Sequence, residues 1–294
     1  MYPNDPLKRV LYIDLGRLSS SVEQRPDLFN TALGGSGVGI QLLAEEIPQG
    51  TDPLGPKNAI VLAVGPLVGH YPLASKTVAI FKSPHTGNLG ESHAGGRSAV
   101  SIRQAGYGAV VIRGNSKLPV YVVIDGDQVH FNDASALWGM RSSYTVGSVL
   151  RVRESGSGLR SIMRIGRGGE QQVSYACVTT ETYRHFGRLG LGAVFGSKGL
   201  KALAICGKRS LPVADRRAYR QTYDELFEAV TKTTLMKKYH DLGTPMNVLP
   251  LNTIGALPTR NLQSGRFEGA ESISGERLAE DYLGRRVACA HCPT

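Results

Sequence analysis

Cysteine and tryptophan are scarce in this chain, with four cysteines and one tryptophan among 294 residues. Four unevenly spaced cysteines are too few for the disulfide scaffold of a small secreted protein. No apolar run approaches the ~18 residues that a membrane-spanning helix needs. The start of the chain, MYPNDPLKRVLYIDL, has no apolar stretch followed by a small-residue cleavage site, as a secretory signal would. We therefore expect a cytoplasmic protein without a membrane span.

Acidic residues are fewer than basic residues. The chain has 24 Asp and Glu and 34 Lys and Arg, which gives a formal net charge of +10. Such an excess is typical of proteins that bind nucleic acid, an anionic cofactor or an acidic partner. The basic residues are scattered, however, and no basic stripe alternates with aromatic residues as single-strand binders require. We therefore expect no nucleic-acid binding, and an anionic cofactor and an acidic partner both stay open.

The pattern of apolar residues changes near residue 208. Before it, short runs rich in β-branched residues are bounded by Gly and Pro, which predicts strands. The predicted strands are 9–15, 59–65, 77–83, 108–114, 119–126 and 201–207, with helices at 38–47 and 142–154. After it, apolar residues at helical spacing predict a helix from about 214 to Gly243 and another over 274–284. The fold class is therefore α+β, with a β-rich domain over 1–208 and the start of a helical domain over 209–294. No internal repeat is obvious.

Three glycine-rich segments interrupt the β-rich part. GGSGVG (34–39) has a G-x-G spacing but no preceding strand, so a tight packing turn is favoured over a dinucleotide site. GESHAGGR (90–97) and GRLGLGAVFGSKGLKA (187–202) follow, and the latter lacks the Gly-Lys-Ser/Thr ending of a P-loop. Backbone N–H groups of such loops can still hold an anion, with Arg188 or Lys198 nearby.

The chain closes on VACAHCPT, where Cys289 and Cys292 form a Cys-x-x-Cys pair. Spacing alone leaves open the start of an iron–sulfur motif, half of a zinc site, and a redox or purely structural pair. A redox dithiol usually lies in a thioredoxin-like context, which this region lacks. Two thiolates cannot hold a four-iron cluster, so a metal here needs ligands from outside this chain.

In order along the chain, a series of segments resembles the tungsten-containing aldehyde ferredoxin oxidoreductases, a family that includes the active-site subunit of class II benzoyl-coenzyme A reductases. The resemblance runs from about Arg9 to Pro293. The matching segments are LYIDL (11–15), GGSGVG (34–39), DPLGPKNAIVLAVGPLVG (52–69), FKSPHTGNLGESHAGG (81–96), AGYGAVVIRG (105–114), DASALWG (133–139), GRLGLGAVFGSKGLKAL (187–203), GALPTRN (255–261) and CAHCP (289–293).

The resemblance implies two β-sheets that form a base for a tungsten (or molybdenum) bis-pterin cofactor, over which helical domains close. It also implies pterin phosphates and a bridging Mg²⁺ held by the segments around Lys76, His93, Arg184 and His185. Close approach of backbone to phosphate accounts for the glycines, and cations offset the phosphate charge. The implied cofactor-binding residues are Lys76, His93, Ala94, Gly95, Arg184, His185, Arg188, Gly190 and Gly192. Cys289 and Cys292 match the first two ligands of a [4Fe-4S] cluster.

The chain departs from the family pattern at four positions. Lys76 stands where Arg is common, His93 where Asn is common, and Ser36 where Arg is common. Lysine meets a phosphate as a point charge, without the bidentate fork of arginine. Arg167 replaces a proline in IGRGGE (165–170). The other cluster cysteines, the D-x-x-G-L pterin segments and the catalytic carboxylate and histidine of the family lie beyond Thr294, so we expect no catalytic residue within the chain.

For a completed protein, the resemblance implies oxidation of an aldehyde to a carboxylate, with electrons passing through the cluster to ferredoxin or another electron-transfer subunit. The expected partners are that subunit, the small-molecule substrate, and a C-terminal portion or complementing chain, with a homodimer possible. Two alternatives stay open. One is a fragment of a benzoyl-coenzyme-A-reductase-like enzyme, and the other is a non-catalytic half that binds pterin phosphates or a partner chain.

Overall fold

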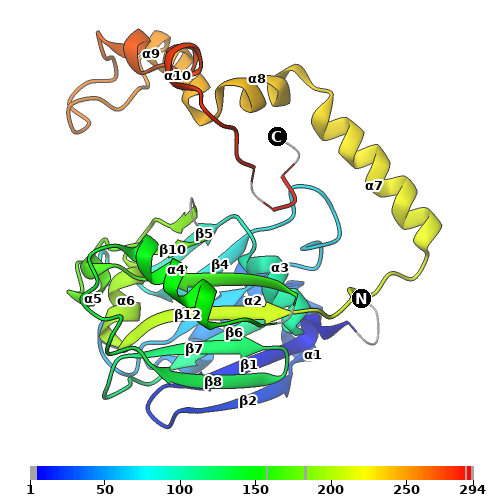
Figure 1. Ribbon diagram of the computed structural model, residues 1–294, viewed down its shortest axis with the longest axis vertical. Helices are drawn as coiled ribbons and strands as arrows, with labels where there is room; N and C mark the ends of the chain where they lie inside the picture. The colour runs from blue at the N-terminus through cyan, green and yellow to red at the C-terminus, as the bar shows by residue number, and fades with distance from the viewer. Residues whose placement is uncertain (1–4, 157, 182–183, 289, 293–294) are drawn as a thin grey trace. The chain divides into compact units, whose positions relative to one another are not determined.

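The computed structural model describes residues 5–156, 158–181, 184–288 and 290–292 (Figure 1). It divides into two compact units, one ending at Ala214 and the other beginning at Asp215, and each is described by itself. The first unit holds the sheets and the second is helical. The predicted α+β class, with two sheets followed by helices, is confirmed.

The first unit contains two six-stranded sheets, A and B. Sheet A has the strand order β2-β1-β6-β3-β4-β5, and sheet B has the order β11-β10-β9-β12-β7-β8. The strands of sheet A are β1 (Arg9–Asp14), β2 (Ser19–Gln24), β3 (Ile60–Ala63), β4 (Thr77–Lys82), β5 (Leu89–Ala94) and β6 (Ala109–Arg113). Those of sheet B are β7 (Val120–Asp125), β8 (Gln128–Asp133), β9 (Leu159–Arg164), β10 (Val178–Thr180), β11 (Arg184–Phe186) and β12 (Leu200–Gly207).

The two sheets repeat one topology. Each begins with an antiparallel hairpin (β1–β2 and β7–β8), whose first strand pairs in parallel with the last strand of its sheet (β6 and β12). The remaining pairs are antiparallel in both sheets. The edge strands β5 and β11 therefore occupy equivalent places. The repeat lies in the strand order, which the sequence did not reveal.

Helices cover and connect the sheets. After α1 (Pro26–Ala32), α2 (Gly35–Glu46) packs on β3 and β4, where a Cβ at Gly39 would come within 2.7 Å of Ile80. In the equivalent place of sheet B, α4 (Ser143–Arg153) packs on β9. The last strands are reached through α3 (Ser98–Ala105) and α6 (Leu191–Ser197), and the short α5 (Arg167–Glu170) packs on α6.

The core follows the alternation of side chains along the strands. On β7, Val120, Val122 and Ile124 join a hydrophobic cluster that both sheets share, whereas Tyr121 and Val123 join a smaller cluster with residues of α4. Almost every side chain of α3 is buried, and this helix packs on β9 and β12. Sheet A and sheet B are therefore halves of one core.

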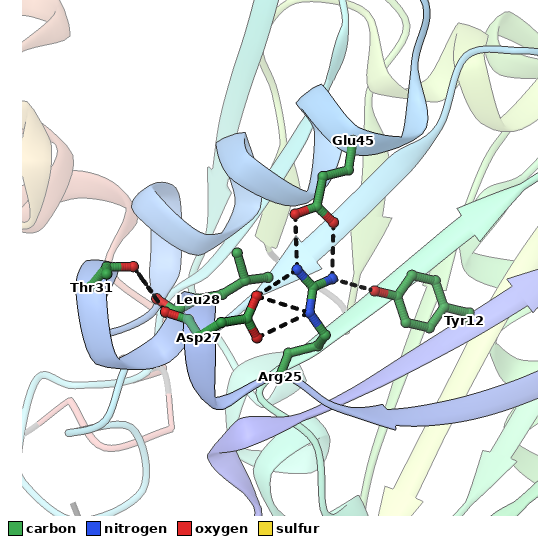
Figure 2. A network of polar contacts seen from close by, with 6 residues as sticks. All are labelled: Tyr12, Arg25, Asp27, Leu28, Thr31 and Glu45. Carbon is green, nitrogen blue, oxygen red and sulfur yellow. Dashed lines mark hydrogen bonds and ion pairs between the residues drawn. The ribbon is translucent and has the colours of Figure 1, made fainter.

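Arg25, directly before α1, is the centre of a network of polar contacts (Figure 2). Its guanidinium donates hydrogen bonds to Glu45 on α2 (2.8 and 2.9 Å), to Asp27 on α1 (2.8 Å) and to the Tyr12 hydroxyl on β1 (3.1 Å). The hydrogen bonds to Glu45 and Asp27 raise the pKa of Arg25, so the group stays charged. One side chain thus forms hydrogen bonds with α1, α2 and β1. Each partly exposed ion pair of this kind contributes only modestly to stability.

The second unit consists of α7 (Arg216–Thr231), α8 (Thr234–Leu242), α9 (Val248–Thr253) and α10 (Gly275–Tyr282). The helix predicted to reach Gly243 is in fact two helices, because the Thr233 hydroxyl accepts a hydrogen bond from the Met236 N–H and starts a new one. Asp215 caps α7 in the same way. Among the described residues, no helix combines the length and the apolar character that crossing a bilayer requires.

Lys198 is a buried cation between the sheets. It is fully buried, and its Nζ donates hydrogen bonds to the carbonyl oxygens of Asn58, next to β3, and of Gly114, next to β6 (3.1 Å for Gly114). Burial lowers the pKa of Lys198 from 10.5 to about 8. The folded protein therefore holds this proton less tightly than the unfolded chain does.

We predict that Lys198→Met removes a pH-dependent part of the stability. Between about pH 8 and pH 10.5 the unfolded chain binds more protons at this lysine, so the wild-type free energy of unfolding gains on the order of 3 kcal/mol from it as pH rises. Urea unfolding from pH 7.5 to 10.5 should show that this gain is missing in the variant. The neighbouring exposed Lys57 supplies the control, and a Lys198→Met profile parallel to that of Lys57→Met would contradict the prediction.

Candidate functional site

The edge strands β5 and β11 lie against each other and join the two sheets. The backbone N–H of Arg188 donates a hydrogen bond to the Ser92 hydroxyl on β5 (3.2 Å), and the Ser83 hydroxyl donates one to the carbonyl of Leu189 (2.7 Å). A Cβ at Gly96 would lie 3.5 Å from Cγ of Arg184. We call this junction of residues 92–97 and 184–190 the β5–β11 corner.

The predicted basic residues gather at this corner. His93 is exposed on β5 opposite Val78 of β4, and Lys76 directly precedes β4 and is exposed as well. From the other sheet, Arg184 and His185 lie on β11, and the exposed Arg188 follows it. Each of these side chains can donate hydrogen bonds to an anion. The structure thus brings together segments that are more than ninety positions apart in the sequence.

Close backbone packing supports the loop that follows β11. Gly190 has φ +82°, and a Cβ there would lie 2.0 Å from the carbonyl oxygen of Ser174. A Cβ at Gly192 would lie 2.5 Å from the carbonyl oxygen of Cys177. Ala94 and Gly95 are buried at the end of β5. These predicted residues therefore shape the corner through the backbone, and the basic side chains supply its charge.

The electrostatics of the corner include groups that the sequence reasoning missed. Arg97, exposed at the start of α3, adds a cation, and Glu91 on β5 adds a carboxylate 2.7 Å from His93 Nε2. Partial burial, together with the charges of Arg164 and Arg184, lowers the pKa of His185. Glu91 and His93 alternate with buried residues in GESHA, a period-2 signal that could have revealed β5.

Three further residues were named from the sequence. Lys198, suggested as an anion contact, is fully buried between the carbonyl oxygens of Asn58 and Gly114 and does not reach the surface. Cys292 is half-buried in the second unit, and Cys289 lies outside the described residues. Within the described ranges, no group of three or more His, Cys, Asp or Glu side chains is placed to hold a metal ion. A complete cluster site is therefore not formed by the described residues.

Known families match almost the whole chain. The pattern described as "Aldehyde ferredoxin oxidoreductase, N-terminal domain" matches residues 10–207, and "Aldehyde ferredoxin oxidoreductase, domains 2 & 3" matches residues 221–294. The chain is 36% identical to the tungsten-containing aldehyde ferredoxin oxidoreductase of Thermococcus kodakarensis, over 97% of this chain and 47% of that protein. Identity to the protein of the same name in Pyrococcus furiosus is 34%, with the same coverage. The chain thus spans about half the length of these curated relatives.

Two other similar proteins carry different names. The "Aliphatic sulfonate oxidoreductase, WOR-like subunit" of Pyrococcus furiosus is 34% identical over 76% of this chain and 39% of its own length. Among solved structures, a chain of the "Active site complex BamBC of Benzoyl Coenzyme A reductase in complex with 1,5 Dienoyl-CoA" superposes with a TM-score of 0.81 at 25% identity. That match covers 98% of this chain and 46% of the other.

We predict that Gly190→Ala destabilises the first unit by about 2 kcal/mol or more, because the left-handed backbone and the Ser174 carbonyl leave no room for a methyl group. Chemical denaturation measures the change. Gly187→Ala is the matched control, since nothing lies within 4 Å of a Cβ at Gly187. Equal stability of the two variants would show that the loop packing has no such constraint.

Proposed function

Because the chain belongs to the aldehyde ferredoxin oxidoreductase family, we propose that its β-rich domain, residues 1–208, binds the phosphates of a tungsten bis-pterin cofactor. Residues 209–294 begin the helical domain that carries the first cluster ligands. The observation that supports this most directly is the β5–β11 corner, where basic side chains from both sheets converge on one surface. It is the longer protein that we propose to be an oxidoreductase.

The donor set of the corner fits a phosphate-bearing cofactor. Lys76, His93, Arg184, His185 and Arg188 are all hydrogen-bond donors with basic side chains, which is the chemistry that phosphate oxygens require. His93 and His185 each stand next to last in an edge strand, at equivalent places of the repeated sheets. A cofactor with two pterin phosphates would thus meet two similar strand ends. A Mg²⁺ ion bridging the phosphates belongs to the same proposal.

The cofactor and the residues of this chain have different roles in this proposal. When bound, the tungsten bis-pterin supplies two-electron redox chemistry. The residues of this chain hold it by phosphate contacts and offset its negative charge, and Gly190 and Gly192 keep the loop after β11 in place beside it. No described residue of the corner is assigned a proton transfer, so we propose that the acid–base groups come from the remainder of the longer protein.

For that longer protein we propose oxidation of an aldehyde to a carboxylate, with electrons passed through a [4Fe-4S] cluster to ferredoxin or another electron-transfer subunit. Cys289 and Cys292 would supply the first two cluster ligands, and the others would come from outside this chain. A benzoyl-coenzyme-A-reductase-like role is the second candidate, favoured by the TM-score of 0.81 to a chain of that complex. Cytoplasmic location is part of the proposal.

Arg184→Ala tests the phosphate contact. We expect inorganic pyrophosphate to bind the variant about tenfold more weakly than the wild-type chain, because a charge-assisted hydrogen bond is lost. Isothermal titration calorimetry at fixed salt measures this, and the complete or complemented enzyme should retain less pterin and tungsten. Arg17→Ala, at the exposed turn after β1, removes the same charge away from the corner. Equal losses in the two variants would reduce the effect to net charge and refute the assignment.

Cys289→Ser tests the cluster ligands in the complete or complemented protein. We expect the visible absorbance of the iron–sulfur cluster to be lost while the first unit stays folded, because serine is a poor substitute for a thiolate ligand. Cys206→Ser, at a buried cysteine of β12, is the control for loss of a thiol elsewhere. Absorbance that survives in Cys289→Ser would remove Cys289 from the ligand set.

A further inference from the structure

Glu91 places a carboxylate among the cations of the β5–β11 corner. Its Oε1 atom accepts a hydrogen bond from the Ser36 hydroxyl (2.7 Å) and lies 2.7 Å from Nε2 of His93. Glu91 and His93 are two residues apart on β5, so both side chains leave the same face of the strand. The carboxylate therefore occupies a position next to a group that the proposed phosphate would use.

The start of α2 helps to hold this carboxylate. Ser36 lies in the first turn of α2, which has no acidic residue of its own there and no side-chain cap. A helix start favours a nearby negative charge, and Glu91 supplies one from a different element. The hydrogen bonds from Ser36 and then from His93, together with the charge of Arg188, hold the pKa of Glu91 below its usual value. Glu91 is therefore negatively charged at neutral pH.

A carboxylate beside an anion site opposes anion binding, because like charges repel and because it engages a donor. We propose that Glu91 competes with phosphate for His93. The carboxylate pairs with His93 in the phosphate-free protein, and a bound phosphate group must displace it from that contact. This inference rests on the proposed phosphate-binding role of the corner. Glu91 then acts as a positioning and specificity-determining residue that limits binding to ligands with enough charge to displace it.

The test is pyrophosphate binding by the 294-residue chain, measured by calorimetry at one pH and one salt concentration for wild type, Glu91→Gln, His93→Gln and the double variant. Glutamine keeps an oxygen that can accept from Ser36 and His93, so mainly the charge changes. We expect Glu91→Gln to bind pyrophosphate about two- to fivefold more tightly, because one negative charge next to the anion is removed at a partly exposed position. In the His93→Gln background the same change should give a smaller gain, because the amide of glutamine replaces the imidazole with which the carboxylate and the phosphate compete.

Two further variants keep the test decisive. Glu23→Gln removes one negative charge from β2, at the opposite edge of sheet A, and should leave the affinity close to that of wild type. Ser36→Ala removes the other hydrogen bond to Glu91 and leaves the carboxylate freer to pair with His93, so pyrophosphate should bind more weakly, the opposite sign to Glu91→Gln. This pair of opposite effects is not expected from a purely structural role of Glu91.

The outcomes separate the two proposals. If wild type binds pyrophosphate and Arg184→Ala weakens it, but Glu91→Gln has no effect or matches Glu23→Gln, the competitor role of Glu91 is wrong and the phosphate site stands. An equal gain from Glu91→Gln with and without His93 also overturns the role. If neither wild type nor Glu91→Gln binds pyrophosphate, both the site and the competitor role fail.

Discussion

The close approach of the two sheet edges is the constraint on which the rest of the first unit depends. At the β5–β11 corner, a Cβ at Gly96, directly after β5, would lie 3.2 Å from Cγ of Glu181 and 3.5 Å from Cγ of Arg184 on β11. This contact brings basic side chains from both halves of the chain to one surface. Like charges gathered in this way repel one another, and a bound anion would relieve that repulsion and stabilise the folded state.

Buried charge is organised differently elsewhere in the same unit. Lys201 pairs with Glu170, and Arg103 pairs with Asp5 at 2.7 Å, with every one of these side chains almost fully buried. Lys198 is satisfied by two carbonyl oxygens instead of a carboxylate. Removing one member of such a pair leaves an uncompensated buried group, which is costly. At the β5–β11 corner, by contrast, Lys76, His93 and Arg188 are exposed, and Glu91 supplies a carboxylate next to His93.

The repeated topology puts β5 and β11 at equivalent edges of the two sheets. Each half of the first unit folds a hairpin and further strands into a six-stranded sheet with two edge strands. One edge strand of each sheet, β5 and β11, lies against the other. Since β11 has only three residues and β5 carries Glu91 and His93, this junction presents polar side chains instead of more core. His93 and His185 are the clearest pair.

The sequence by itself determined the β-branched strands, such as those over 59–65 and 201–207, and the helical second part, because burial and periodicity leave direct marks on residue type. The family followed from the resemblance of ordered motifs along the chain. The same resemblance named the basic residues of the corner. Only the tertiary structure decided that β5 meets β11, that 214–243 breaks into two helices, that Lys198 is buried, and that Glu91 sits beside His93. Contacts between elements far apart in the chain depend on packing and register, and the alternation within one strand such as GESHA does not say which other strand it meets.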